Sequence, residues 1–453
     1  MAATQENQEV DVDRDAVAAT PWAGPPVERH PLHGERYTSP AFFEREWESM
    51  WTKVWLLLGR ENAMSAPGSY QVEEVGPESI IMVRQDDGTI RAFYNVCQHR
   101  GSRLVFSAEG DTSAFSCPYH GWTYSTDGAL TMAQDPDDFP ENPCDHIRLV
   151  EVACDTFAGF VWVNMDPDCA SLRDYLGPLW DEWARYQADD WQRVTALTVR
   201  VPCNWKVLQD NFCESYHLPT VHPQLKESHE DSYLDTTFDR SVHGHNRMIM
   251  KGATPSRTQY GDDAPLPENV ADRLTLWGLD AAAFEDHPFD ARLALQTQMR
   301  SLGPERGHNH YANLRDDQFT DAHHYNLFPN CSLTFGPDGV LLQRMRPHPT
   351  DPNSCVFDHW YYAFVPAGTG LVGAQTNIRV DGIEAEHQIF DYGDRPMGII
   401  PDQDVSITIG QQLGLRSRGY RGAHVAGQEE RISWFHQVID EYIAGDRPDR
   451  SSE

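Results

Sequence analysis

Long hydrophobic runs and basic residues are scarce in this sequence. The nearest approach to a membrane-spanning run, Val54–Leu58, is far too short to cross a bilayer. Residues 1–10 carry neither the basic nor the apolar region of an export signal. Only 36 Lys and Arg stand against 69 Asp and Glu, which gives a net charge of −33. Such a surface repels nucleic acid and anionic membranes, so we exclude both as partners and expect a cytoplasmic protein.

Two other common features are missing. No Gly-rich dinucleotide fingerprint lies between a strand and a helix, so we do not expect this chain to bind a nicotinamide cofactor itself. Seven of the nine cysteines have no tight spacing, and we expect most of these to be reduced and buried. The other two, Cys97 and Cys117, belong to a motif.

That motif has two parts, Cys97-x-His99 and Cys117-x-x-His120. Two Cys and two His suit a structural zinc ion. They equally suit a Rieske [2Fe–2S] cluster, in which two Cys hold one iron and two His hold the other. Because each part offers one sulfur and one nitrogen, the pattern favours the cluster over zinc, whose sites more often group Cys with Cys.

The flanking segments indicate that both parts are loops of a β domain. Residues 92–96 alternate like a strand that leads into the first loop, and residues 122–130 predict a strand followed by a turn at Asp127-Gly128. Loops at the ends of paired strands suit a cluster that must lie near the surface for electron exchange.

A second motif is Glu214-x-x-His217-x-x-x-x-His222. Glu214 and His217 would share one helix face, whereas two His five apart lie about 140° around a continuous helix. Pro219 breaks the helix between them, so His222 can fold back toward His217. Two His need a carboxylate to complete a facial triad for Fe(II), and spacing alone does not locate it.

The sequence Cys-Pro-Tyr-His-Gly-Trp at 117–122, with Asn-Trp-Lys at 204–206 before the two-His motif, resembles the Rieske non-haem iron oxygenases. The resemblance is to the large (alpha) subunit of aromatic ring-hydroxylating dioxygenases. It implies that the third iron ligand is Asp404, at the start of a late helix, with Asp402 as the alternative. A helix-capping role for Asp404 remains the competing interpretation.

The resemblance also implies roles for two neighbouring residues. Glu214 would lie between His217 and the cluster ligand His120 of an adjacent subunit, and would orient both imidazoles. Many relatives have Asp at this position; Glu occurs among enzymes that act on quaternary amines. Asn211 is expected to line the iron pocket.

The expected fold is α+β, with two domains. We expect a flexible N-terminal tail over 1–35, a helical arm over 36–55 that packs on the catalytic domain, a small antiparallel β Rieske domain over 56–165, and a catalytic mononuclear iron domain over 166–453. The resemblance implies that the catalytic domain is an antiparallel sheet flanked by helices, of the helix-grip or START-like kind.

The implied function is that of a terminal oxygenase component with a [2Fe–2S] Rieske cluster and a mononuclear Fe(II). It would use O2 and electrons from NAD(P)H, through a separate reductase and possibly a ferredoxin, to hydroxylate an aromatic or other hydrophobic cyclic substrate. One alternative is a monooxygenase that demethylates a quaternary amine or methoxy compound; another is a zinc-stabilised, non-enzymatic binding protein.

The resemblance implies a homotrimer, or an α3β3 assembly with a small β subunit. Arg100 and Arg103, beside the first loop, are a hypothetical dock for an acidic ferredoxin.

Three further His pairs are expected by chance among twenty His, and none has a carboxylate at ligand spacing. These pairs are His243 with His245, His308 with His310, and His323 with His324.

Overall fold

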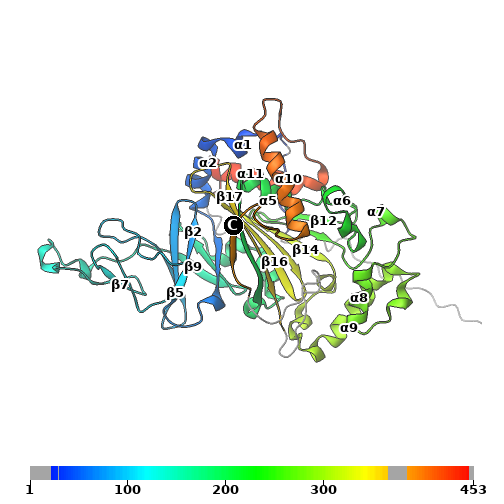
Figure 1. Cartoon of the computed structure of the whole chain (residues 1–453), viewed down its shortest axis with the longest axis horizontal. Coiled ribbons are helices and arrows are strands. Elements are labelled where there is room, and N and C mark those ends of the chain that lie inside the picture. Colours follow the sequence, from blue (N-terminus) through cyan, green and yellow to red (C-terminus); the bar gives the residue numbers. More distant parts are fainter. Residues whose placement is uncertain (1–21, 29, 366–384, 448–453) are drawn as a thin grey trace, which may run out of the picture.

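The computed structural model describes residues 22–28, 30–365 and 385–447. Figure 1 shows an elongated molecule with a smaller β part on the left and a larger sheet covered by helices in the centre and on the right. Strand β7 lies near the far left end, whereas helix α10 lies over the centre.

The smaller part contains two antiparallel sheets. A seven-stranded sheet has the order β1-β10-β9-β4-β3-β2-β5, and a three-stranded sheet has the order β6-β7-β8. A turn at Asp87-Gly88 joins β3 to β4, and Gly88 adopts a φ of 86°. The strand bounds are β1 Leu56–Arg60, β2 Ser69–Val75, β3 Glu78–Arg84, β4 Ile90–Tyr94, β5 Glu109–Asp111, β6 Ala114–Ser116, β7 Thr123–Ser125, β8 Leu130–Met132, β9 Glu151–Phe157 and β10 Phe160–Asn164.

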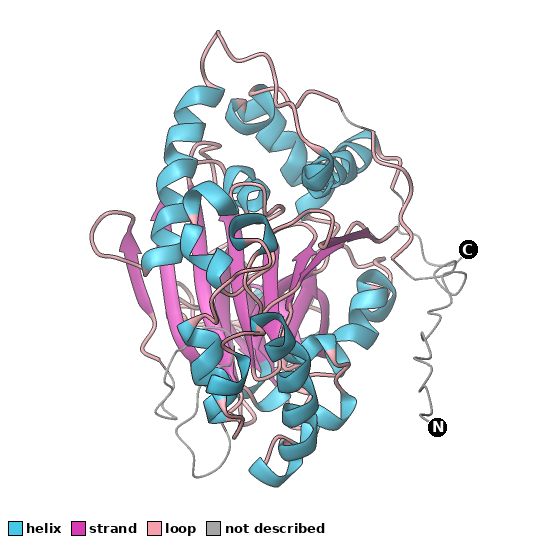
Figure 2. Cartoon of the chain, turned by 90° about the vertical axis from the view of Figure 1, so that its right-hand side faces the viewer, coloured by secondary structure: helices cyan, strands magenta, loops and turns pink. Residues whose placement is uncertain are grey.

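The larger part is built on an eight-stranded sheet of order β12-β13-β14-β15-β16-β17-β11-β18. Its pairings are antiparallel except at one edge, where β18 runs parallel to β11. Figure 2 shows the strands side by side with helices packed in front of them. The strand bounds are β11 Gln192–Val201, β12 Thr237–Arg240, β13 Asn246–Met250, β14 Ala322–Leu327, β15 Cys331–Gly336, β16 Gly339–Pro347, β17 Cys355–Ala363 and β18 Gln388–Asp391.

Helices cover this sheet and its edges. The stretch 172–186 has a helical sequence pattern, but it forms two helices within 172–184, because Gly177 takes a φ of 52° immediately before Pro178. The helix bounds are α1 Glu35–Thr38, α2 Pro40–Glu46, α3 Leu172–Leu176, α4 Pro178–Ala184, α5 Trp205–Asn211, α6 Leu218–Val221, α7 Arg257–Tyr260, α8 Glu268–Leu276, α9 Ala291–Leu302, α10 Ile399–Leu415 and α11 Glu430–Ala444, with a π-helical turn at Trp47–Trp51. The mixture of antiparallel sheets and helices is the α+β class expected from the sequence.

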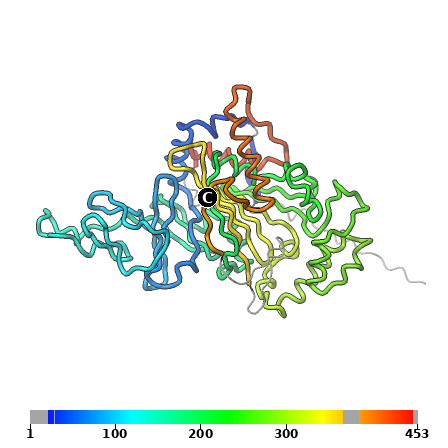
Figure 3. Tube along the Cα trace, viewed as in Figure 1, coloured from blue at the N-terminus to red at the C-terminus, as the bar shows by residue number. Residues whose placement is uncertain are grey.

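The N-terminal segment lies against the larger part. The trace in Figure 3 brings the blue N-terminal helices beside the red C-terminal end, and α2 contacts α11. Trp22 is only 4% exposed and lies under the guanidinium of Arg247. This portion of the predicted tail is therefore anchored by apolar burial rather than flexible; residues 1–21 of that prediction lie outside the described residues.

Candidate metal centres

Cys97 and Cys117 each begin a tight loop of the same form at the end of the small β part. The amide of Cys97 donates to the carbonyl of Ser102, and the amide of Cys117 to that of Trp122, both at 2.8 Å. Gly101 and Gly121 close the loops with φ of 74° and 71°, a conformation that side-chain-bearing residues rarely adopt. The two Cys-to-Gly spacings in the sequence are therefore equal because both loops need the same turn.

The loops bring two thiols and two imidazoles together. Cys97 and Cys117 are 1% and 4% exposed, and the rings of His99 and His120 are 4.7 Å apart. Buried Nδ1 of His120 has no hydrogen-bond partner among the described residues, as expected of a nitrogen positioned to bind a metal. The donor set fits a cluster with two sulfur and two nitrogen ligands.

The loops also favour the thiolate form of Cys117, which is the form that binds a metal. Burial acts to raise the pKa of Cys117, but the backbone N–H groups of Tyr119 and His120 and the neighbouring Cys97 outweigh it, and the pKa is lowered. Burial raises the pKa of Cys97, whose sulfur lies 3.4 Å from the hydroxyl of Tyr124. The sequence does not indicate this role for Tyr124, because Tyr124 lies on β7 and the loop of Cys97 follows β4 in the other sheet.

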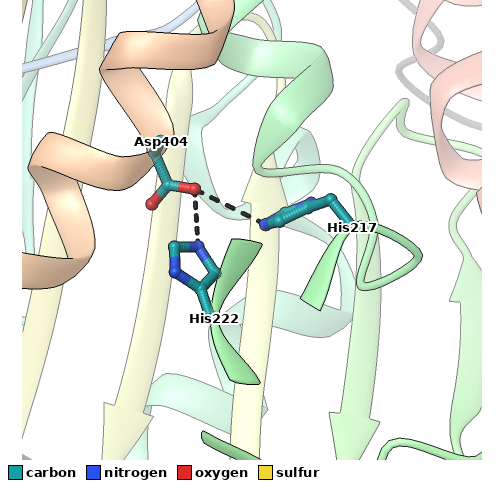
Figure 4. A group of neighbouring side chains, drawn as sticks. All are labelled: His217, His222 and Asp404. Atoms are coloured by element: carbon teal, nitrogen blue, oxygen red, sulfur yellow. Dashed lines mark hydrogen bonds and ion pairs between the residues drawn. The ribbon is translucent and has the colours of Figure 1, made fainter. Parts of the chain in front are cut away.

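The second group comprises His217, His222 and Asp404 (Figure 4). His222 Nε2 lies 2.8 Å and His217 Nε2 lies 3.5 Å from the same oxygen, Oδ1 of Asp404. The potential ligand atoms all lie within 4.8 Å of one another. Asp402 is not in this group, because its carboxylate accepts from the backbone N–H groups of Met397 and Gly398 at the start of α10.

Local backbone geometry explains how two His five apart converge. His217 precedes the single turn of α6, which contains Pro219, and His222 leaves the helix with φ −123° and ψ 55°. Asp404 comes from α10, inside the helix rather than at its cap, which is Gly398. A helix-capping role for Asp404 therefore does not explain its position.

Neighbouring polar side chains form hydrogen bonds with Nδ1 of both imidazoles and with the carboxylate of Asp404. His217 Nδ1 lies 2.6 Å from Oε1 of Glu214, whose other oxygen accepts from the amide of His217 at 3.1 Å. His222 Nδ1 lies 2.8 Å from Oε1 of Gln403, and Asn211 Nδ2 donates to Asp404 at 3.0 Å. Both imidazoles thus have Nδ1 bonded outward and Nε2 directed at the shared carboxylate. This is the pattern of metal-binding His, so the residues fit a mononuclear iron. Gln403 carries no motif signal apart from its place before Asp404.

The electrostatics of the group favour positive charge. Burial alone would lower the pKa of His217, but Asp404 and Glu214 outweigh it and raise the pKa to about 10. Burial likewise acts to raise the pKa of Asp404, yet hydrogen bonds from His217, His222 and Asn211 lower it. A divalent cation between these groups would replace the proton and be stabilised by the same carboxylates.

The group lies on the wall of a cavity of about 760 Å³. One side of the cavity is the sheet, with His324 on β14, Leu341 on β16 and Tyr361 on β17, and the other is the segment around His217 together with the start of α10. Among the described residues that line it, there is no Lys or Arg.

Two of the remaining His pairs do not form a set of metal ligands like that of His217 and His222. Nδ1 of His245 accepts from the amide of Phe328 and its Nε2 donates to the carbonyl of Tyr175, which accounts for both nitrogens. His323 and His324 point to opposite faces of β14, and only His324 lines the cavity.

For His308 and His310 the expectation of no carboxylate partner is wrong. Asp338, distant in sequence, lies 2.8 Å from His308 Nδ1, and the hydroxyl of Tyr311 donates to it at 2.6 Å. His310 Nε2 donates to the carbonyl of Pro337 at 2.8 Å. Burial acts to raise the pKa of Asp338, but the two His outweigh it and lower the pKa to about 2. This is a buried hydrogen-bonded cluster whose donors and acceptors match without a metal ion.

Two family profiles match the chain. Residues 54–143 match "Rieske [2Fe-2S] domain", and residues 188–445 match "Ring hydroxylating alpha subunit (catalytic domain)". Together with the fold, they define an oxygenase of the Rieske type. The second match covers more than half of the sequence, and the chain belongs to the ring-hydroxylating alpha subunit family. Its two domains imply a Rieske [2Fe–2S] cluster and a mononuclear iron as cofactors.

Curated relatives fall into two functional groups. The chain is 33% identical over 296 residues to the carnitine monooxygenase oxygenase subunit of Escherichia coli (strain K12), covering 62% of this chain and 77% of that protein. It is 28% identical over 348 residues to the biphenyl 2,3-dioxygenase subunit alpha of Rhodococcus jostii (strain RHA1), covering 73% and 68%. A solved quaternary ammonium Rieske monooxygenase shares the fold, with a TM-score of 0.65 at 21% identity over 91% of this chain and 95% of that one.

Members of this family need separate electron-transfer partners, an organic substrate and O2. Within the part of this chain that the structure describes, no helix has the length and apolar character to span a membrane.

Proposed function

We propose that this chain is the terminal oxygenase component of a Rieske system in which His217, His222 and Asp404 hold the catalytic iron. The observation that carries the proposal is the convergence of these side chains, from α10 and from the segment around α6, on the wall of a cavity of about 760 Å³. An oxygenase needs such a site beside a space for an organic molecule. The bound iron would supply O2 activation.

Cys97, His99, Cys117 and His120 are proposed to hold the Rieske cluster. Their support is the matched pair of loops and the unpartnered Nδ1 of His120. We assign residues 56–165 to the cluster domain and 166–453 to the catalytic domain. All nine Cys are free, which supports a reducing compartment and hence a cytoplasmic location.

We further propose a head-to-tail ring of subunits, either a homotrimer or α3β3. In Figure 1 the end of the molecule that carries β7 is remote from α10, which supports electron delivery between chains rather than within one. Glu214 would accept a hydrogen bond from His217 in its own chain and from His120 of the partner subunit. The contact to His217 at 2.6 Å supports the first half of this role.

The residues around the iron site have proposed positioning roles. Glu214 and Gln403 would keep Nδ1 of each imidazole occupied, so that Nε2 faces the metal. Asn211 would hold the carboxylate of Asp404 in the orientation that both imidazoles need. Electrons would come from NAD(P)H through a separate reductase, with or without a ferredoxin.

Two substrate classes are candidates. The cavity wall includes Leu218, Met248 and Met250 and, among the described residues, has no cationic side chain, which favours hydroxylation of an aromatic or other hydrophobic cyclic compound. The similarity to carnitine monooxygenase and the Glu at position 214 favour demethylation of a quaternary amine. Hydroxylation of a methyl group on a quaternary nitrogen gives an N-hydroxymethyl ammonium, which splits into formaldehyde, the tertiary amine and a proton. Like aromatic monohydroxylation, this inserts one oxygen atom of O2, and the other leaves as water after reduction by two electrons from NAD(P)H.

The test uses purified protein with its reductase partner and labelled O2. Wild type is expected to contain non-cluster iron and to incorporate label into a product, whereas Asp404→Ala should keep the signal of the reduced cluster and lose both properties. Labelled product from Asp404→Ala, or wild-type protein that binds no iron beyond the cluster, would contradict the proposal.

A further inference from the structure

Two polar residues on the cavity floor have no assigned role. Gln343 on β16 and His359 on β17 are paired across the antiparallel strands, so their side chains stand next to each other on one face of the sheet. Both line the cavity that contains His217, His222 and Asp404. They are 16 residues apart in sequence, so only the strand register brings them together.

Polar atoms of the Gln343 and His359 side chains have no hydrogen-bond partner among the described residues. Gln343 is only 5% exposed and has no side-chain hydrogen bond to any described residue; its amide atoms are not fully buried, because they reach the cavity. Buried Nδ1 of His359 likewise has no partner in the described part of the chain. Buried amide and imidazole groups are normally paired, because losing water without a replacement partner is unfavourable.

The opposite face of the same strands carries a buried ion-pair network. Arg344 and Asp358, also paired in register, form an ion pair at 2.7 Å, and Arg346 lies 2.9 Å from the same carboxylate. Nε1 of Trp360 and the hydroxyl of Tyr362, on that opposite face of β17, also have no partner among the described residues, but Gln343 and His359 face the cavity, where a ligand could supply partners.

The two residues are uncharged at neutral pH. Burial lowers the pKa of His359 to about 4, although Asp404 and Asp402 act in the opposite direction. The pair thus offers neutral donors and acceptors: the N–H and C=O of the Gln amide and the N–H and bare nitrogen of the imidazole.

Charged ligands find little to bind in this cavity. No Lys or Arg among its described lining residues could take up a carboxylate. The carboxylates of Glu214 and Asp404 are bonded to His217 and His222, and the aromatic rings of the described lining are those of Phe212 and Tyr361. A quaternary ammonium group is best bound by several aromatic faces or a free carboxylate.

We propose that Gln343 and His359 are specificity-determining residues that bind an uncharged hydrogen-bonding group on the substrate, a carbonyl beside an N–H in a ring. The inference rests on the proposed oxygenase function and narrows its substrate class to neutral cyclic compounds of lactam type. The apolar remainder of the cavity would hold the ring, and this pair would fix its orientation toward the iron ligands.

The test compares ligands of similar size by calorimetry on cluster- and iron-containing protein. The probes are quinolin-2(1H)-one, which carries the lactam, naphthalene, which lacks it, and L-carnitine. Wild type should bind the lactam at least about tenfold more tightly than naphthalene, and carnitine most weakly. Gln343→Met and His359→Phe, which conserve volume, should each weaken lactam binding about tenfold and leave naphthalene within about twofold.

Leu341→Met is the matched control, since Leu341 lines the same cavity one step along β16 on the same face. It should change the affinity for both bicyclic compounds to the same extent. The inference would be overturned by equal wild-type affinities for the lactam and naphthalene, or by a Gln343 or His359 variant that loses as much naphthalene binding as lactam binding. It would also be overturned by tightest binding of carnitine or by no binding of either bicyclic compound. Failure of the oxygenase function is seen separately, as wild-type protein without non-cluster iron.

Discussion

Glu214→Gln should weaken iron binding and slow turnover while leaving the cluster intact. Oε1 of Glu214 lies 2.6 Å from His217 Nδ1, and its other oxygen accepts from the amide of the same residue. The carboxylate side chain is 9% exposed, so solvent screens this interaction little. Gln conserves the shape and removes the charge.

The magnitude follows from the kind of contact that is lost. A hydrogen bond between a charged group and an imidazole contributes about 1.5–3 kcal/mol, and residues that orient metal ligands typically change affinity or activity by about 10- to 100-fold. We expect a loss in that range for iron affinity in Glu214→Gln. Turnover should fall further if Glu214 also contacts His120 of the partner subunit, because both bonds depend on the same carboxylate.

The assay measures three quantities on the same preparation: non-cluster iron at defined free Fe(II), the paramagnetic resonance signal of the dithionite-reduced cluster, and product formed per O2 consumed. Glu214→Asp keeps the charge but shortens the side chain, so it separates charge from reach. Glu227→Gln is the control, since Glu227 is exposed and follows the iron segment. Iron affinity and turnover of Glu214→Gln within about twofold of wild type would refute the reasoning.

Three further outcomes are expected. Asn211→Ala should weaken iron binding about tenfold, because the Asp404 carboxylate loses a hydrogen bond of 3.0 Å; the measurement is the iron titration, and an unchanged titration would count against the role of Asn211. Burial lowers the pKa of His245 to about 3, so the folded protein keeps this imidazole neutral. The free energy of unfolding is therefore highest above pH 6.5, the ordinary pKa of the side chain, and decreases as the pH drops from there toward 3, because only the unfolded chain takes up the proton. Between pH 7 and 5 wild type should lose about 2 kcal/mol through this residue, and urea unfolding of His245→Gln should lack that loss. Arg100→Glu, at an exposed side chain beside the cluster loop, should slow cluster reduction by an acidic ferredoxin and flatten its salt dependence; stopped-flow traces identical to wild type would exclude the dock.

The sequence predicts best where the geometry is local. The two cluster loops are short segments whose Cys, His and Gly positions determine the turn directly, so their resemblance to a known family is visible without a structure. The effect of Pro219 on the path from His217 to His222 is also local and follows from elementary backbone sterics.

Contacts between residues that are distant in the sequence could not be predicted from residue spacing alone. Spacing does not locate Asp404, which lies 182 residues beyond His222, and family resemblance supplied that residue. Nothing in the sequence joins His308 to Asp338, or Gln343 to His359, because each pair depends on how strands and turns come together. The carboxylate partner of His308 was missed for this reason: Asp338 comes from the turn before β16.

The N-terminal arm belongs energetically to the iron domain. Glu46 on α2 and Lys206 on α5 form an ion pair at 2.7 Å with both side chains fully buried. The hydroxyl of Tyr37 on α1 donates to Asp210 at 2.6 Å, and Asp210 immediately precedes Asn211, whose amide contacts Asp404. Removing one partner of a buried pair costs about 3–5 kcal/mol because the other charge is left uncompensated. Helix α5, which positions Asn211, is therefore stabilised by its contacts with α1 and α2. The part of the chain that supports the proposed iron site thus includes these two helices before β1, and does not begin at the boundary between the two sheets.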